Sequence, residues 1–144
     1  MLVYLDTCCL NRPYDDQSQT RIQMETAAIL AVMQRVVDGQ VSLSHSQVLA
    51  FEVNRIPEEI RREGILNFFG YCSDFQMLAE AVETRGTLLH SLGFKRMDAL
   101  HLASAEALKA DIFLTTDDRF AACATRSMQH ISLAVINPIP FLTR

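Results

Sequence analysis

The chain has 144 residues, of which 49% are hydrophobic and 21% are charged, and its formal net charge is −4. These values are typical of one globular domain and exclude a disordered or coiled-coil chain. The longest nearly apolar stretch, residues 26–33, is too short to cross a bilayer, and no basic segment like that of a signal peptide opens the sequence. We therefore expect a cytoplasmic protein whose negative charge gives no general attraction to nucleic acids.

The four cysteines include no C-x-x-C pair, which argues against a zinc site. Cys8 and Cys9 are adjacent, and adjacent cysteines rarely bond to each other, whereas Cys72 and Cys123 stand alone. All four have apolar neighbours in the sequence. We expect them to be reduced and to act as small core residues.

The first elements are a buried strand and a long helix. An unbroken apolar run at residues 2–5 predicts a strand that is covered on both faces, and it is followed by a polar loop at residues 11–18. The spacing of Thr20 and Gln23 fits a capping box at the start of an amphipathic helix, and Gly39 is suited to end that helix.

The rest of the chain alternates between apolar strands and helices. We expect strands at residues 41–46, 111–116 and 132–136, and helices at residues 47–56, 58–69, 75–92, 98–110 and 117–124. Strands that are separated by helices predict a parallel sheet between two helical layers. The predicted fold class is therefore α/β, a three-layer α/β/α sandwich with a central parallel sheet, formed by a single domain over residues 1–144.

Two acidic residues stand where hydrophobic packing should continue. Asp6 closes the apolar first strand, and in parallel sheets functional groups gather beyond the carboxyl ends of the strands. A turn or a helix cap is the structural alternative for Asp6. Three of the four helical neighbours of Glu52 are apolar, so Glu52 interrupts a packing face. Its alternative is a surface position paired with Arg55.

Three further aspartates lie at the ends of elements. Asp98 opens a helix rich in Ala and Leu, where it suits the positive end of the helix dipole and lies near the edge of the core. Asp117 and Asp118 follow the strand at residues 111–116. One of this pair can cap the next helix, which leaves the other for a different role.

Carboxylates that cluster repel one another, and burying them is costly unless a cation compensates the charge. A hard divalent ion with oxygen ligands would resolve this conflict. Mg²⁺ and Mn²⁺ are the ions that suit ligation by carboxylates and water. The placement of the acids thus predicts a site for Mg²⁺ or Mn²⁺.

Four short segments follow one another in a characteristic order along the chain. They are Asp6-Thr7 after a hydrophobic strand, Glu52 in a short helix, the segment DALHLASA that starts at Asp98, and the segment LTTDDRF that starts at Leu114. In this order the segments resemble the PIN-domain family of metal-dependent ribonucleases, many of whose small bacterial members are VapC-like toxins of type II toxin–antitoxin pairs. The resemblance covers residues 2–137, and the two C-terminal segments are the more specific. It implies an RNA substrate, a cognate antitoxin protein and a homodimer.

The resemblance also implies roles for individual residues. The metal-binding and catalytic acids would be Asp6, Glu52, Asp98 and Asp117. The spacing of Thr115 and Phe120 around the last acid favours Asp117 over Asp118. Thr7 and Thr115 match the hydroxyl positions beside the first and last acids, and Asn11 matches a polar position after the first strand.

The chemistry that this arrangement predicts is metal-assisted hydrolysis. One or two metal ions would activate a water molecule for in-line attack on an RNA phosphodiester, without a covalent enzyme intermediate. Thr7, Asn11 and Thr115 would orient ligands or water. The basic residues near the acids either contact neighbouring phosphates or are solvated surface residues: Arg12, Arg55, Lys95 and Arg96. His101 lies three positions after Asp98 on nearly the same helical face. We favour a hydrogen-bonded helical histidine over the alternative of a general base or a ligand, because the metal already supplies the activated water.

Three other functions compete with the nuclease. A phospho-aspartate phosphohydrolase needs a second aspartate two residues after Asp6, where this chain has Cys8. A receiver domain of a signalling relay needs adjacent acids after the first strand and a lysine after a late strand, and neither is present. A catalytically idle PIN-like binding module is the third alternative, which the intact set of four acids disfavours.

Overall fold

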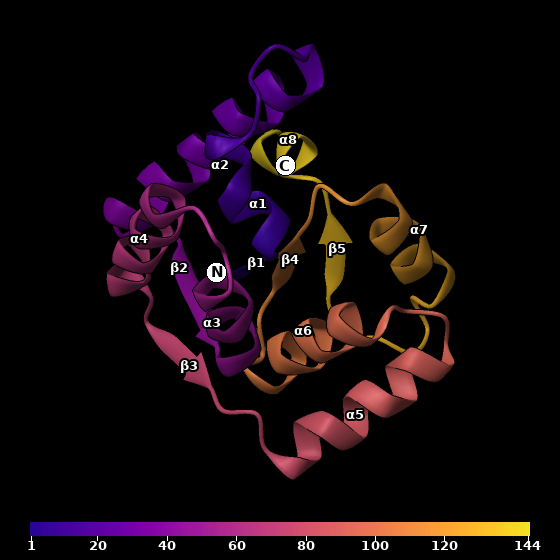
Figure 1. Ribbon diagram of the computed structural model, residues 1–144. Coiled ribbons are helices and arrows are strands. Elements are labelled where there is room, and N and C mark those ends of the chain that lie inside the picture. Colours follow the sequence, from indigo (N-terminus) through magenta and orange to yellow (C-terminus); the bar gives the residue numbers. More distant parts are fainter.

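Strand β1 (Leu2–Leu5) lies in the centre of a five-stranded parallel sheet, in a computed structural model that describes residues 1–144. The strand order is β3-β2-β1-β4-β5, with β2 at Ser42–Ser46, β3 at Asp74–Gln76, β4 at Ile112–Leu114 and β5 at Ala134–Ile136. In register, Val3 pairs with Leu43 on one side and with Ile112 on the other. Helices cover both faces of the sheet (Figure 1), which confirms the predicted three-layer α/β/α fold.

The alternation of side chains along the strands divides the core in two. On β1, Val3 and Leu5 belong to one cluster and Tyr4 to the other. The first cluster is completed by residues of α1 (Thr7–Asn11), α2 (Thr20–Val37), α3 (Gln47–Asn54), α4 (Glu59–Phe68) and α8 (Pro138–Leu142). The second is completed by residues of α5 (Glu80–Ser91), α6 (Arg96–Ala107) and α7 (Asp118–Arg126).

The central crevice follows from the strand order. The chain passes from β1 to β2 and β3 on one side of the sheet, and later returns to β4 and β5 on the other side. The carboxyl ends of β1 and β4 therefore lie next to each other at the point where the direction of winding reverses, which is where open α/β sheets bind ligands. Asp6 directly follows β1, and Thr115 directly follows β4.

The structure corrects several local expectations. The segment 75–92 is not one helix, because residues 74–76 pair with β2 as strand β3 before α5 begins at Glu80. The capping box is also wrong: α2 begins at Thr20 after Gln19, with no side-chain cap, and the Gln23 amide donates to the carbonyl of Gln17. The short helices α1 and α8 were not expected, and each is capped by the side chain before it, Asp6 and Asn137.

Other expectations are confirmed. Gly39 directly follows the C-cap of α2 with φ +76°, a conformation that glycine adopts without a steric cost. All four cysteines are free, with Cys9 and Cys123 buried and the other two half-buried. None of the helices combines the length and the apolar character that a membrane crossing requires.

Candidate functional site

The carboxylate of Asp6 is the buried centre of the site. Its Oδ1 accepts from the backbone N–H of Thr7 at 2.8 Å, and its Oδ2 accepts from the hydroxyl of Thr115 at 2.8 Å. Only 6% of the residue is exposed. Burial, with a smaller contribution from the neighbouring Cys8, raises the pKa of Asp6 to about 8. Asp6 therefore does cap a helix, as the structural alternative required, but its side chain is held in an environment where a negative charge lacks compensation.

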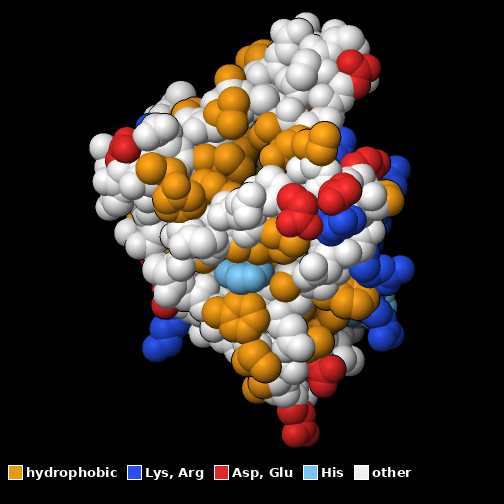
Figure 2. Space-filling view, turned by 60° about the vertical axis from the view of Figure 1, so that its left-hand side comes forward, with side chains coloured by type: hydrophobic (Ala, Val, Ile, Leu, Met, Phe, Trp, Pro, Cys, Tyr) orange, Lys and Arg blue, Asp and Glu red, His pale blue; other side chains and the backbone are white.

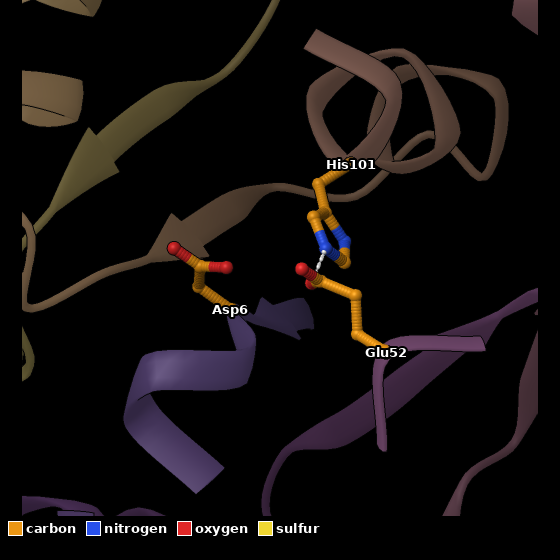
Figure 3. Close-up of side chains that lie close together, drawn as sticks. All are labelled: Asp6, Glu52 and His101. Atoms are coloured by element: carbon orange, nitrogen blue, oxygen red, sulfur yellow. Dashed lines mark hydrogen bonds and ion pairs between the residues drawn. The ribbon is translucent and has the colours of Figure 1, made fainter. Parts of the chain in front are cut away.

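Glu52 reaches the same place from α3. Its Oε1 accepts from the hydroxyl of Thr7 at 2.6 Å and is hydrogen-bonded to Nε2 of His101. Figure 3 shows the side chains of Asp6, Glu52 and His101 directed toward one another, and one ligand atom of each lies within 4.8 Å of the other two. Burial alone would raise the pKa of Glu52, but the bonds from His101 and Thr7 outweigh burial and lower it. Glu52 is therefore ionised.

The predicted alternative for Glu52, an ion pair with Arg55, is not formed. The guanidinium of Arg55 lies 5.2 Å from the centre of the Phe51 ring and makes no ion pair.

Asp98 and Asp117 are the other two predicted acids, and neither belongs to the cluster of Asp6, Glu52 and His101. Asp98 lies in the first turn of α6, and Asp117 is the N-cap of α7. Both line one hollow of about 300 Å³. Burial, followed by the charges of Asp6 and Asp117, raises the pKa of Asp98 to about 6. The charges of Asp6 and Asp117 act on Asp98, and Asp98 and Asp117 share a hollow, whereas the group whose ligand atoms lie within 4.8 Å of one another is Asp6, Glu52 and His101.

Several carboxylate oxygens in this set have no hydrogen bond. Oδ1 of Asp117 accepts from the backbone N–H groups of Arg119 and Phe120, at 2.9 and 3.3 Å, while its Oδ2 has no partner. Oε2 of Glu52 and both carboxyl oxygens of Asp98 are likewise without donors. A set of partly buried carboxyl groups, two of which, Asp6 and Asp98, have raised pKa values, is chemically suited to a hard divalent ion such as Mg²⁺ or Mn²⁺.

Two hollows flank the acids. One, of about 390 Å³, is lined by Thr7, Asn11, Phe51, Glu52 and Arg55, among others. The second is the one that holds Asp98 and Asp117, and its rim carries Lys95, Arg119 and Arg126. None of these four cations takes part in an ion pair. Each of the two hollows therefore carries at least one basic side chain that is not neutralised by an ion pair within the protein.

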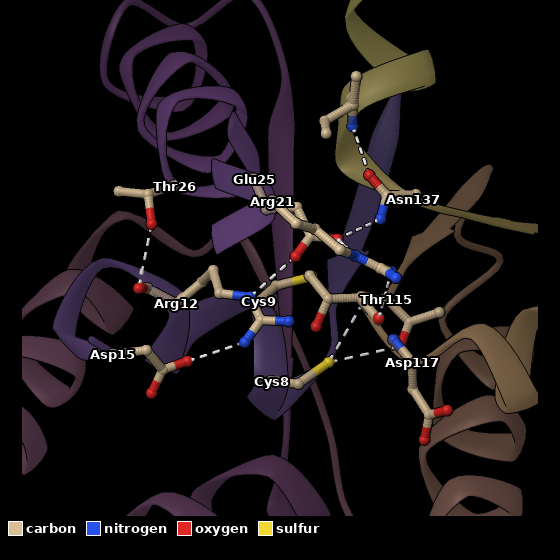
Figure 4. Close-up of polar contacts among 12 residues, drawn as sticks. Cys8, Cys9, Arg12, Asp15, Arg21, Glu25, Thr26, Thr115, Asp117 and Asn137 are labelled. Carbon is tan, nitrogen blue, oxygen red and sulfur yellow. Dashed lines mark hydrogen bonds and ion pairs between the residues drawn. The ribbon is translucent and has the colours of Figure 1, made fainter. Parts of the chain in front are cut away.

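Arg12 forms ion pairs inside the protein and is neither a phosphate contact nor a solvated surface residue, the two alternatives that the sequence left open. Its Nε bonds to Glu25 at 3.0 Å and its Nη1 bonds to Asp15 at 3.0 Å (Figure 4). Glu25 is fully buried and also accepts from Arg21 and Asn137. Arg12 is committed to this internal network, so its charge is not free for a phosphate. The network joins α2 to the turn after α1 and to the residue that caps α8.

Asp118 is separated from Asp117 by its own ion pair. Its two oxygens accept from Arg21 at 2.8 Å each, and its side chain is 74% exposed. The structure therefore gives the two adjacent aspartates different roles: Asp117 caps α7 and faces the hollow, and Asp118 binds α2 through Arg21. Asn11 lines the other hollow and accepts from Arg61 at 3.4 Å.

Sequence reasoning missed two residues behind the site. Tyr4 and Ser46 are fully buried, and they connect to His101 through hydrogen bonds. The expected hydrogen-bonded state of His101 is confirmed, because both of its ring nitrogens have partners. The only signal for this arrangement was a tyrosine hydroxyl in an otherwise aliphatic strand, which burial obliges to find a partner.

No protein-family model matches the chain, and no curated protein matches it in sequence. Among solved structures, it is similar to a chain from the crystal structure of VapBC2 of Rickettsia felis bound to a DNA fragment from their promoter. The likeness covers 95% of this chain and 98% of that chain, with a TM-score of 0.56 and 12% sequence identity. At this identity it shows the fold: the chain folds like a component of a VapBC2 complex.

Proposed function

We propose that the protein is a metal-dependent endoribonuclease that hydrolyses phosphodiester bonds in RNA. The observation that supports this proposal is the cluster of Asp6, Glu52 and His101, whose ligand atoms lie within 4.8 Å of one another, with Asp98 close enough to Asp6 for the charge of Asp6 to raise its pKa. Asp98 shares a hollow with Asp117, and several oxygens of these carboxylates accept no hydrogen bond. The likeness in fold to a VapBC2 chain and the resemblance of the sequence motifs to PIN-domain ribonucleases support it.

The four acids would hold one or two Mg²⁺ or Mn²⁺ ions. When bound, such an ion supplies activation of a water molecule and neutralisation of charge on the phosphate. The chain contributes the orientation of the ligands: Thr115 holds Asp6, and Thr7 holds both Asp6 and Glu52. A divalent charge would also remove the cost of ionising Asp6 and Asp98 in their partly buried positions.

The free cations would place the substrate. Lys95, Arg119 and Arg126 can bind phosphates on one side of the acids, and Arg55 can bind a phosphate on the other. The exposed ring of Phe51, beside Arg55, offers a surface on which a base can stack. Single-stranded RNA suits this arrangement, because its bases are free to reach an aromatic ring.

We further propose the role of the toxin in a type II toxin–antitoxin pair, acting in the cytoplasm. The structural neighbour belongs to a complex of two proteins named VapBC2, which supports a cognate antitoxin partner. Figure 2 shows hydrophobic side chains gathered on one face of the molecule. On α2 and α4, the large hydrophobic residues Met24, Leu30, Val37 and Ile60 are each about half exposed or more. Such a face supports contact with another protein, either an antitoxin or a second copy in a homodimer. Phe68 and Phe69 are half-buried and pack against the first core cluster.

The test of the nuclease is cleavage of single-stranded RNA by purified protein with Mn²⁺. We expect Asp6→Asn and Asp98→Asn to abolish cleavage while the proteins stay folded, and Asp118→Asn to retain it, because Asp118 binds Arg21 outside the acidic set. Intact RNA at high enzyme concentration would contradict the proposal and favour an idle binding module. A phosphoryl group on Asp6, seen as a mass shift with a small phosphodonor, would favour the receiver alternative.

A further inference from the structure

A chain of buried hydrogen bonds runs behind Glu52. The hydroxyls of Ser46 and Tyr4 are 2.6 Å apart, and the Tyr4 hydroxyl lies 2.7 Å from Nδ1 of His101. The other ring nitrogen, Nε2, is bonded to Oε1 of Glu52 (Figure 3). Ser46, Tyr4 and His101 are at most 1% exposed. This series of hydrogen bonds thus links the end of β2, the centre of β1 and helix α6 to Glu52 on α3. The ring of His101 has no other hydrogen-bond partner.

Counting donors and acceptors places each proton. The backbone N–H of Leu49 donates to Oγ of Ser46 at 3.0 Å, so the proton of Ser46 itself has the oxygen of Tyr4 as its acceptor. The proton of Tyr4 then goes to Nδ1 of His101, and burial, which raises the pKa of Tyr4 well above its ordinary value, keeps that proton on the hydroxyl. The arrangement that gives every group of this hydrogen-bond chain a partner therefore has Nδ1 of His101 as the acceptor and Nε2–H directed at Glu52.

The reverse arrangement leaves a buried group without a partner. If Nε2 carried no proton, or if both nitrogens did, then Nδ1–H would donate to Tyr4, and Tyr4 would donate to Ser46. Oγ of Ser46 would then accept from both Tyr4 and Leu49, and its own proton would have no acceptor in a fully buried place. Unpaired buried donors of this kind are costly, so the order of the chain is fixed in one direction.

The two donors converge on one oxygen of Glu52. Oε1 accepts from Nε2–H of His101 and from the hydroxyl of Thr7 at 2.6 Å, whereas Oε2 accepts from no group. Holding Oε1 in this way turns Oε2 away from the protein donors. The ring nitrogen that lies nearest to Asp6 and Glu52 is the one that carries the proton, and it has no lone pair to offer to a cation.

We infer that His101 is a positioning residue for Glu52, locked as the Nε2–H tautomer by Tyr4 and Ser46, and not a ligand of the metal. The inference rests on the proposed function for the role of Glu52 as a ligand. The direction of the hydrogen-bond chain does not depend on that function, because it is a property of the protein without metal.

The first test is nuclear magnetic resonance of the metal-free protein, labelled with ¹⁵N in its histidines. We expect the signals of His101 to show a protonated Nε2 and an unprotonated Nδ1 that accepts a hydrogen bond, and we expect Tyr4→Phe to change that pattern. A protonated Nδ1 would overturn the inference, whether or not the protein binds any metal.

The second test is a Mn²⁺ titration followed by electron paramagnetic resonance, without RNA. His101→Gln keeps an amide N–H that can reach Glu52, so we expect affinity within about threefold of wild type, whereas we expect His101→Leu to weaken binding by about ten- to a hundredfold. His130→Gln, on an exposed histidine, is the matched control and should change nothing. If His101→Leu does not fold, Tyr4→Phe tests the same chain and should weaken binding by a smaller factor.

The outcomes separate the two hypotheses. Equal loss of affinity in His101→Gln and His101→Leu would make His101 a ligand, and unchanged affinity in His101→Leu would remove its positioning role. If the wild-type protein binds no Mn²⁺ at all, the metal site of the proposed function fails, while the tautomer of His101 still decides the direction of the hydrogen-bond chain.

Discussion

The buried carboxyl of Asp6 makes the stability of the metal-free protein depend on pH in a defined direction. Asp6→Asn replaces this carboxyl with a neutral group of the same shape, whose oxygen can accept from Thr7 N–H. Its nitrogen would lie where Oδ2 of Asp6 accepts from the Thr115 hydroxyl and the Cys8 thiol, and it can donate to the Thr115 oxygen. The substitution therefore removes the titrating proton and leaves a donor at the second position, as the protonated carboxyl of Asp6 would. We expect the variant to be more stable than wild type at neutral pH without metal, and equally stable in acid.

The magnitude follows from the pKa of Asp6, which rises from its ordinary value of 3.8 to about 8 on folding. Because the folded state holds the proton of Asp6 more tightly than the unfolded state does, proton binding stabilises the folded wild-type protein. This stabilisation is fully present below the pKa of the unfolded state and is lost as the pH rises toward the pKa of the folded state. A difference of one bound proton changes the free energy of unfolding by about 1.4 kcal/mol per pH unit, or about 4 kcal/mol between about pH 4 and about pH 7. Part of the rise in the pKa of Asp6 comes from its interaction with Cys8. We therefore expect the free energies of unfolding of the two proteins to differ by at least about 2 kcal/mol over that pH range.

The assay is urea unfolding at a series of pH values, with a chelator present. Asp118→Asn is the matched control, because Arg21 lowers the pKa of this exposed aspartate and the variant should therefore lose stability above the ordinary pKa, the opposite sign. Saturating Mn²⁺ should then stabilise wild type by about 2.7 kcal/mol at a hundred times its Kd, and should leave Asp6→Asn unchanged.

A stability difference between wild type and Asp6→Asn that does not vary with pH would refute this reasoning. It would mean that Asp6 is ionised in the folded protein without a cation, and that its burial is compensated by groups other than a metal.

Three further predictions concern the site and the layers around it. The affinity for Mn²⁺ should rise between about pH 6 and about pH 8 in calorimetric titrations, because Asp98 and Asp6, with pKa values of about 6 and about 8, must lose their protons to bind the ion; a flat profile would contradict the site. Phe113→Ala should cost about 3–5 kcal/mol in urea unfolding, because this fully buried ring stacks on Tyr4 at 5.0 Å and packs against Phe120; a loss below about 1 kcal/mol would contradict the described core. Arg12→Met should cost about 3 kcal/mol by removing one partner of the fully buried Glu25, whereas the same change at the exposed Arg126 should stay within about 0.5 kcal/mol.

The sheet was predictable where strand signals were strong. The runs at β1 and β4 are apolar at every position and buried on both faces, so their sequence alone indicates a central place in a parallel sheet. Strand β3 gave no such signal, because Asp74–Gln76 lies at an open edge and forms only through pairing with β2 and the contact of Phe75 with His45. Tertiary pairing decided its conformation, and no local pattern could reveal it.

The acids were predictable for a related reason. Asp6 and Glu52 interrupt faces that the pattern of neighbours marks as buried, and an interruption of that kind has to be compensated in the fold. The partners that compensate them were not predictable. Whether Arg12 faces a phosphate or Glu25, and whether His101 meets Glu52, depends on side-chain directions that arise only when α2, α3 and α6 pack together. Sequence spacing does not determine those directions.

Anomalous diffraction from crystals of the protein grown with Mn²⁺ would show directly whether the acids hold a metal ion. We expect a manganese peak between the carboxylates of Asp6 and Glu52, within coordinating distance of Asp98 or Asp117, with Oε2 of Glu52 and not Oε1 facing the ion. A crystal in which these carboxylates bind no manganese at saturating concentration, or in which the ion lies elsewhere on the molecule, would contradict this expectation.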